Sequence, residues 1–235
     1  MSRIIFPLDF SNVSEAEYFI DILKEHVAMF KIGLELFYKA GPNWVKNIVK
    51  EKNIKLFLDV KLHDIPNTVL GAVRNLLDIN PEFITVHLDE AKQFREIVYK
   101  KSKFEGFLCV SFLTSLNDAD LHNLYVDKSI TVSDYVLKKA ELSVEAGCKG
   151  LVCSASEAGR VKAVYGDELV VVTPGIRLQE GNVTGDDQKR IVTPYEAVLN
   201  GSDFLVIGRP IRRAKNPVEV CEKINIEVNR ALSLF

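Results

Sequence analysis

Residues 55–68 read KLFLDVKLHDIPNT, and within them an apolar, strand-like run changes abruptly into charge. Asp59 and Lys61 are two positions apart, so on a strand both side chains point to the same face. Asp64, three residues further on, can curl back toward them from the loop that follows. Charges on a buried face are costly unless they are paired. The stretch therefore indicates either a functional site or a surface ion-pair network.

Apolar runs of strand length recur along the whole chain, and segments with helical spacing separate them. Near-continuous apolar strands are typical of a parallel sheet that is buried on both faces. Helical spacing is clearest in residues 14–26, 67–78, 133–147 and 219–235. The eight expected strands are residues 3–9, 30–36, 55–61, 83–88, 106–112, 150–154, 169–175 and 204–209.

Eight strands, each followed by a helix, in a chain of 235 residues match the size of a (β/α)8 barrel. We therefore predict an α/β fold with one (β/α)8 TIM-barrel domain over residues 1–235. A doubly wound open sheet is the alternative, but it normally carries a Gly-rich phosphate turn after its first strand. Here that turn reads PLDFSNVS (7–14) and has no glycine. Longer connections at 113–129 and 176–192 lie at the end of the barrel where active sites are found.

Two helix boundaries can be predicted from local signals. Ser14, with Glu17 three residues later, is a capping-box signature for the start of the first helix. Gly147 closes the helical segment 133–147, as expected of a C-terminal stop.

The composition limits the class of function. The chain is 47% hydrophobic and 26% charged with a net charge of -2, which gives no electrostatic case for binding nucleic acid or a membrane surface. No apolar run approaches the ~20 residues of a membrane span, and with no signal peptide the chain is expected to be cytoplasmic. The cysteines lack zinc-ligand spacing and are expected to be buried, reduced thiols: Cys109, Cys148, Cys153 and Cys221.

Polar side chains stand at the carboxyl ends of the expected strands, where barrels place their catalytic groups. One charged strand end is common, whereas a converging ring of seven charges indicates a site. His63, beside the opening stretch, is expected to be structural, and His87 either supports the site or packs in the core. In chain order the polar set is Asp9, Lys31, Asp59, Lys61, Asp64, His87, Ser111, Thr114, Ser154, Arg177 and Arg209.

The last two strand ends suggest a phosphate site. Loops after the seventh and eighth strands form the common phosphate site of barrels. Gly175 and Gly208 would let backbone N–H groups approach closely, and Arg177 and Arg209 would supply guanidinium groups. The alternative is that these are turn glycines beside solvated arginines.

The Asp59–Lys61–Asp64 array suits proton transfer. A lysine held between two carboxylates stays charged and can hand over a proton while it stabilises a carbanion at the same point. That chemistry requires no metal, although the same carboxylates could instead hold a divalent cation.

In these residues the sequence resembles the orotidine 5'-monophosphate decarboxylase family, in its bacterial type. The D-x-K-x-x-D pattern is shared with related barrel enzymes, whereas IPNT directly after it makes the match specific. The resemblance covers essentially the whole chain. The matching motifs are PLDF (7–10), FKIGLELF (30–37), DVKLHDIPNT (59–68), LTS (113–115), GLVCSASEA (150–158), VTPGIR (172–177), DQKRIVTP (187–194) and VIGRPI (206–211).

The resemblance implies a reaction: orotidine 5'-monophosphate loses carbon dioxide to give uridine 5'-monophosphate, the last step of de novo pyrimidine synthesis. It also implies a homodimer with sites at the interface, and neither a cofactor nor a metal. Lys61 would protonate C6 of the pyrimidine as the carboxylate leaves. Asp59 would lie near the departing carboxylate and anchor Lys61, and Asp64 of the partner subunit would complete the array.

The same resemblance implies the residues that bind the substrate. Asp9 and Lys31 would meet the ribose hydroxyls, and Thr68 of the partner subunit would touch the ribose. The other expected substrate-binding residues are Ile65 in the IPNT segment, Thr114 at the base, Arg177, Gly208 and Arg209 at the phosphate, and Gln188 on a lid that bridges phosphate and base. Two positions depart from the pattern, since GDDQKR (185–190) has one Asp more than expected before Gln188, and Ser115 could serve in place of Thr114.

Two other functions compete. A metal-dependent aldolase similar to 3-hexulose-6-phosphate synthase shares D-x-K-x-x-D and a phosphate site, and Glu35 is available near the second strand as an acidic ligand. A catalytically silent barrel that binds a nucleotide is the other alternative. Against the silent barrel, every charged member of the array is present.

Overall fold

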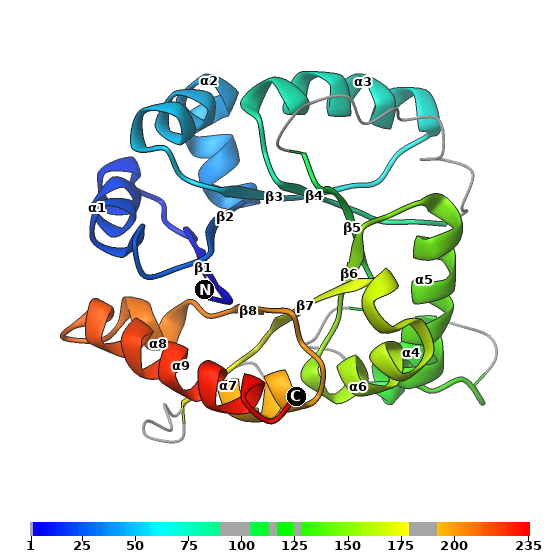
Figure 1. Ribbon diagram of the computed structural model, residues 1–235. Coiled ribbons are helices and arrows are strands. Elements are labelled where there is room, and N and C mark those ends of the chain that lie inside the picture. The colour runs from blue at the N-terminus through cyan, green and yellow to red at the C-terminus, as the bar shows by residue number, and fades with distance from the viewer. Residues whose placement is uncertain (1, 90–103, 113–116, 125–127, 179–191) are drawn as a thin grey trace.

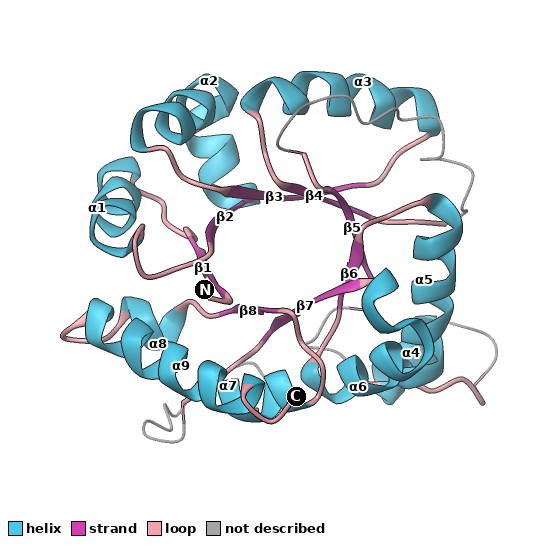
Figure 2. Ribbon diagram, viewed as in Figure 1, coloured by secondary structure: helices cyan, strands magenta, loops and turns pink. Residues whose placement is uncertain are grey.

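The computed structural model describes residues 2–89, 104–112, 117–124, 128–178 and 192–235. Eight parallel strands form a closed barrel in chain order, with β8 paired back to β1. Figure 1 looks into this ring of strands, and Figure 2 shows the helices arranged around its outside. The strands are β1 (Ile4–Pro7), β2 (Met29–Gly33), β3 (Leu56–Leu62), β4 (Phe83–Val86), β5 (Gly106–Val110), β6 (Gly150–Val152), β7 (Val170–Pro174) and β8 (Phe204–Val206).

The predicted (β/α)8 barrel is confirmed, and each expected strand overlaps the observed one. The open-sheet alternative is wrong, because β1 pairs with both β2 and β8 and leaves no edge. The described helices are α1 (Val13–Leu23), α2 (Leu34–Lys52), α3 (Pro66–Leu76), α4 (Asp118–Leu124), α5 (Val132–Ala146), α6 (Ala155–Tyr165), α7 (Pro194–Leu199), α8 (Arg209–Arg212) and α9 (Pro217–Leu232), with 3-10 turns η1 (Leu77–Ile79) and η3 (Gly166–Glu168).

One predicted helix boundary is confirmed and the other is wrong. Gly147 ends α5 at φ 73°, a left-handed conformation that glycine adopts without strain. Helix α1, however, begins one residue before Ser14, because the side chain of Asn12 accepts the backbone N–H of Ser14 at 2.9 Å and acts as the N-cap. Glu17 accepts a hydrogen bond from Trp44 Nε1 on α2 instead of closing a capping box.

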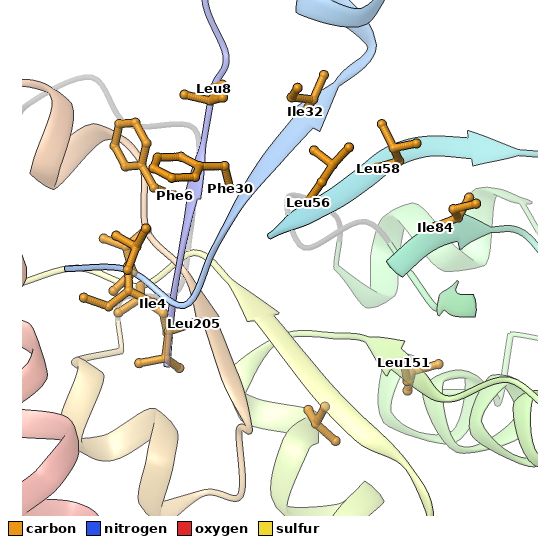
Figure 3. Packing of buried hydrophobic residues seen from close by; sticks show 14 of the residues in the cluster. Ile4, Phe6, Leu8, Phe30, Ile32, Leu56, Leu58, Ile84, Leu151 and Leu205 are labelled. Carbon is orange, nitrogen blue, oxygen red and sulfur yellow. The ribbon is translucent and has the colours of Figure 1, made fainter. Parts of the chain in front are cut away.

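Alternate strand residues face the barrel interior and the helices. A cluster of inward side chains, including Ile5, Met29, Phe57 and Phe83, fills the interior. Their outward neighbours, such as Phe30 and Leu58, join the larger cluster under the helices that Figure 3 shows. Because the interior is plugged by apolar side chains, the next inward residues toward the carboxyl ends stand above the plug. On β1 to β3 and the residues directly after them these are Pro7, Asp9, Lys31 and Asp59. On β4 the next inward position after Phe83 is Thr85.

The cysteine prediction is confirmed as far as burial goes. All four cysteines are buried and free. Burial raises the pKa of each thiol, in the case of Cys221 to about 12, so the thiols stay protonated and unreactive.

Within the described ranges, no helix has both the length and the hydropathy to cross a membrane.

Candidate active site

A pocket of about 300 Å³ opens at the carboxyl end of the barrel. Its volume lies at the lower end of the range for small-molecule sites. Its lining combines charged side chains with apolar ones, among them Val110, Phe112 and Val152. The expected site residues that line it are Asp9, Lys31, Asp59, Lys61, Arg177, Gly208 and Arg209.

Asp59 is the centre of a charge cluster in this pocket. Lys61 Nζ lies 2.7 Å from Asp59 Oδ1, and Lys31 Nζ lies 3.2 Å from Asp59 Oδ2. Lys31 Nζ also lies 3.2 Å from Asp9 Oδ1. The side chains of Asp59 and Lys31 are only 14% and 11% exposed, so the cluster is not the surface ion-pair network that the sequence left open.

The charges hold one another ionised. Burial alone would raise the pKa of Asp59, but the attraction of Lys31 and Lys61 outweighs it and lowers that pKa below its ordinary value. Burial alone would lower the pKa of Lys31, but Asp59 and Asp9 outweigh it and raise that pKa. The pocket therefore keeps a fixed anion beside two cations near neutral pH.

Strand β3 carries Lys61 on an irregular backbone. Leu58 pairs with Ile84 and Leu62 pairs with Val86, so three residues of β3 stand opposite one residue of β4. Lys61, within this bulge, has φ 49°, a left-handed conformation that is strained for a residue with a side chain. Backbone strain of this kind gathers at functional sites.

The segment after β3 points away from this cluster. Residues 63–68 are all exposed, and none of them lines the pocket in the described part of the chain. Asp64 Oδ1 accepts the backbone N–H of Ile65 at 2.7 Å, and Lys61 is ion-paired with Asp59 instead. The prediction that Asp64 curls back to Lys61 within one chain is therefore wrong. Ile65, at the start of α3, is an apolar side chain with 66% of its surface exposed.

The arginine side of the pocket is built by the segments after β7 and β8. Gly175, directly after β7, has φ 87°, and the backbone N–H of Arg177 donates a hydrogen bond to Val192 O at 3.0 Å. A Cβ at Gly208 would lie 2.7 Å from Pro7 Cγ, so a larger residue would not fit there. Arg177 and Arg209 are half-buried and line the pocket, which disfavours the reading of solvated arginines beside turns.

The histidines form a separate group beside the pocket. His63 Nε2 lies 2.7 Å from Asp89 Oδ2, and the rings of His63 and His87 are 5.3 Å apart. Burial, followed by the nearby His63, Lys139 and Lys61, lowers the pKa of His87. His87 therefore favours the neutral form and is partly buried next to the site, which agrees with a supporting position.

Comparison with known proteins gives a consistent result. Residues 2–224 match the family model described as the orotidine 5'-phosphate decarboxylase / HUMPS family. The chain belongs to this family. Among its relatives, an orotidine 5'-phosphate decarboxylase of Syntrophus aciditrophicus is 39% identical over 243 aligned residues, which cover 99% of this chain and 95% of that protein. One of Carboxydothermus hydrogenoformans is 40% identical over 223 residues, covering 91% and 90%.

Solved structures agree with the family assignment. The crystal structure of orotidine 5'-phosphate decarboxylase from Lactobacillus acidophilus superimposes with a TM-score of 0.80 at 30% identity, covering 97% of this chain and 100% of that one. The resemblance predicted from the motifs is thus confirmed.

Two of the substrate contacts predicted from the resemblance, one to the base and one from the lid, involve residues outside the described ranges. Thr114, its neighbour Ser115, and Gln188 lie outside the described residues. Two other residues were missed by the sequence reasoning. Thr85 bonds to both Asp59 and Lys61, and a Cβ at Gly33 would lie 3.2 Å from Lys31 Nζ, so the glycine leaves room for the Lys31–Asp9 pair. Thr85 has no sequence signal, because it reads as an ordinary strand residue, whereas Gly33 lies within the FKIGLELF motif (30–37), which does not show its role beside Lys31.

The metal-dependent alternative finds little support in the geometry. Glu35 is an exposed residue in the first turn of α2 and is absent from the pocket lining. Over the described ranges, no three His, Cys, Asp or Glu side chains are arranged to hold a metal ion. The carboxylates that do face the pocket, Asp9 and Asp59, are occupied by lysine ammonium groups.

Proposed function

We propose that this chain converts orotidine 5'-monophosphate into uridine 5'-monophosphate and carbon dioxide, as a decarboxylase of de novo pyrimidine synthesis. The family match and the names of its relatives support the reaction class. One observation on the structure carries the proposal further. The charged residues follow one another around the barrel mouth in the order in which the substrate presents its phosphate, ribose and base.

The order follows from strand pairing. β7 pairs with β8, β8 with β1, β1 with β2, and β2 with β3. Arg177, Gly208 and Arg209 follow β7 and β8 and would bind the phosphate. Asp9 and Lys31, on the next two strands, would bind the ribose hydroxyls. Asp59 and Lys61 on β3 are then left for the carboxylated edge of the pyrimidine, away from the phosphate.

The chemistry needs one acid at one carbon. The bond from C6 to the carboxylate breaks, its electron pair stays on C6, and carbon dioxide leaves. Lys61 then gives a proton to C6, and its ammonium stabilises the developing carbanion. Asp59, whose pKa is lowered by Lys31 and Lys61, lies 2.7 Å from Lys61 Nζ and holds that side chain in place. These steps use only side chains, so we propose that the enzyme needs no metal and no cofactor.

Binding energy far from C6 contributes to the rate. The phosphate is remote from the reacting carbon, yet its contacts can be used to orient the base and to order a closed site. Under this proposal Thr114 meets the base, and Gln188 on the lid bridges base and phosphate. Both assignments rest on the motifs alone, because the two residues lie outside the described ranges.

We also propose a homodimer in which each subunit completes the other's site. Asp64, Ile65 and Thr68 are exposed and do not reach the pocket of their own chain. In the proposed dimer the partner subunit would cover the apolar side chain of Ile65, which is 66% exposed in the single chain. In the proposed dimer, Asp64 and Thr68 of one subunit approach Lys61 and the ribose in the other. We expect this dimer to work in the cytoplasm.

The first experiment follows the orotate chromophore by ultraviolet absorbance. Purified protein is mixed with orotidine 5'-monophosphate, with and without EDTA, beside the Lys61→Ala variant. We expect the wild type to lose the orotate absorbance at the same rate with and without EDTA. The Lys61→Ala variant should show no such loss. Activity lost in EDTA would move the assignment to the metal-dependent aldolase class, and binding without conversion would indicate a silent barrel.

The shared site has its own test. Inactive Lys61→Ala and Asp64→Ala protomers are mixed and allowed to exchange subunits. A mixed dimer holds one site in which both residues are intact, so partial activity should return. No recovery after proven exchange, or sedimentation of an active monomer at assay concentration, would exclude Asp64 from the neighbouring site.

A further inference from the structure

A buried hydroxyl joins the two central charged residues of the pocket. Thr85 on β4 is only 1% exposed. Its Oγ1 accepts the backbone N–H of Lys61 at 2.8 Å and donates to Asp59 Oδ1 at 3.1 Å. A threonine hydroxyl has a single proton to donate, so that proton is committed to Asp59. One side chain therefore holds the backbone of the expected acid and the carboxylate that anchors it.

The β3 bulge explains why a side chain is needed here. Thr85 is the single β4 residue that stands opposite Asp59, Val60 and Lys61. Extra residues in a bulge leave the regular ladder and need other partners for their backbone groups. The left-handed Lys61 finds its partner in the Thr85 hydroxyl. Without that bond, the strained conformation that aims Lys61 at the pocket loses a support.

We propose that Thr85 is a positioning residue for decarboxylation, which keeps Lys61 aimed at the reacting carbon and Asp59 turned toward Lys61. This inference rests on the proposed function. Thr85 acts through these two residues, because its side chain is buried and its hydroxyl is bonded to both of them. It is not a catalytic residue, since it has no part in the pocket lining formed by the described residues.

Two consequences follow from removing the hydroxyl. The first is geometric, because a displacement of ~1 Å near the reacting atoms can lower a rate by about 100-fold. The second is electrostatic. A hydrogen bond to the ionised form of a carboxyl group favours that form, so losing the Thr85 hydroxyl should raise the pKa of Asp59. Asp59 faces Lys31 and Lys61, with Asp9 beyond Lys31, and these charges remain when the hydroxyl is removed.

The kinetic test compares Thr85→Val, which keeps the shape and removes the hydroxyl, with Thr85→Ser, which keeps the hydroxyl. We expect Thr85→Val to lower kcat by about 10- to 100-fold while KM changes less than about threefold. Thr85→Ser should restore most of kcat. A Thr85→Val enzyme with the kcat of the wild type would overturn the proposal.

Thr173→Val serves as the matched control for a purely structural loss. Thr173 is also a fully buried strand threonine, and its Oγ1 lies 2.7 Å from Ser202 Oγ. It alternates with Val172 and Pro174, which face the barrel interior, so its side chain points toward the helices. Thr173→Val should lower the melting temperature as Thr85→Val does and leave kcat unchanged. Equal kcat losses in both variants would reduce Thr85 to a structural role.

A titration separates this inference from the proposed function. The Asp59 carboxyl carbon is followed by 13C NMR against pH, with its signal assigned from Asp59→Asn. Thr85→Val should move the midpoint upward relative to the wild type. If the wild type fails to convert orotidine 5'-monophosphate, the proposed function falls, and the titration still decides whether Thr85 holds Asp59. An unmoved midpoint overturns the inference in either case.

Discussion

Each end of the barrel holds an aspartate shared between two basic side chains, and the two arrangements differ in what else they bind. At the carboxyl end, Asp59 is paired with Lys31 and Lys61. At the amino end, Asp203 lies 2.7 Å from Lys162 Nζ and 3.9 Å from Arg3. The side chains of Asp59 and Asp203 are both mostly buried.

The amino-end cluster is tied to the backbone. Asp203 Oδ2 accepts the backbone N–H of Val171 at 2.7 Å, and Lys162 Nζ donates to Leu169 O at 3.0 Å. The Glu82 carboxylate likewise accepts the backbone N–H of Leu56 at the start of β3. These charges join the beginnings of neighbouring strands, so their role is stability.

The carboxyl-end cluster is held by side chains. The hydrogen bonds to Asp59 come from the Lys61 ammonium and the Thr85 hydroxyl, with the Lys31 ammonium at 3.2 Å. The lysines face a pocket and keep donor capacity for a ligand. The same residue types thus stabilise strand ends on one side and are available for chemistry on the other. Matched substitutions at the two ends, compared for their effects on activity and on stability, test that distinction.

The largest difference is expected between Lys61→Ala and Lys162→Ala. A positioned general acid contributes about 10²- to 10⁴-fold, so Lys61→Ala should lower kcat by at least that range while the fold persists. Lys162→Ala should lower the melting temperature and leave kcat per folded molecule unchanged. Steady-state kinetics with circular-dichroism melts measure both quantities. A Lys162→Ala enzyme as inactive as Lys61→Ala would erase the functional distinction between the ends.

The arginines give the next contrast. Arg209→Ala should lower kcat/KM for orotidine 5'-monophosphate by about 10- to 100-fold, because a charge-assisted contact to phosphate contributes roughly 1.5–3 kcal/mol. For the nucleoside orotidine, which has no phosphate, the change should be small. Arg3→Ala at the amino end should affect neither substrate. If Arg209→Ala lowered kcat/KM equally for orotidine 5'-monophosphate and for orotidine, Arg209 would not be a phosphate contact.

The sequence predicted the barrel because eight near-continuous apolar runs, each followed by a helical segment, fit the size of a (β/α)8 fold. An inward apolar residue such as Phe57 is followed two positions later by an inward polar residue such as Asp59 at the strand end. A closed parallel barrel brings those ends together whatever the loops do, so Asp9, Lys31, Arg177 and Arg209 reach one pocket as expected.

Local backbone irregularity was beyond that reasoning. The β3 bulge changes which β4 residue meets Asp59 and Lys61, and a period of two contains no sign of it. Thr85 therefore looked like any β-branched strand residue. The short sequence distance between Asp64 and Lys61 also allowed a contact within one chain, whereas the structure leaves residues 63–68 exposed and bonds Asp64 Oδ1 to the backbone N–H of Ile65.

A smaller effect is expected from Asp203→Ala. The substitution removes the acceptor of the Val171 N–H and leaves Lys162 without its nearest carboxylate, and a lost buried hydrogen-bond partner costs about 1–3 kcal/mol. The free energy of unfolding from urea titration should fall by that amount, with kcat unchanged. Unaltered stability would show that the amino-end cluster does not secure the strand beginnings.

The smallest effect concerns acid stability and Asp59. Burial raises the pKa of Asp59, but the combined attraction of Lys31 and Lys61 is larger. The folded-state pKa of Asp59 therefore lies below the ordinary value of 3.8. The unfolded chain therefore takes up a proton near pH 3.8 that the folded chain still refuses, so the stabilisation is present above that pH and is lost as pH falls toward the lower folded-state pKa.

Asp59→Asn removes this titration and so tests the sign directly. Urea unfolding at about pH 5, about pH 4 and about pH 3 should show the wild type losing free energy of unfolding more steeply than the variant over the lowest interval. At about pH 5 Asp59 is ionised in both the folded and the unfolded wild type, so the difference between the two proteins should be full there, and it should begin to narrow at about pH 4 as the unfolded carboxyl takes up a proton. Parallel curves down to the lowest pH would mean that Lys31 and Lys61 do not hold Asp59 ionised against its burial, and the charge balance proposed for the carboxyl-end cluster would be wrong.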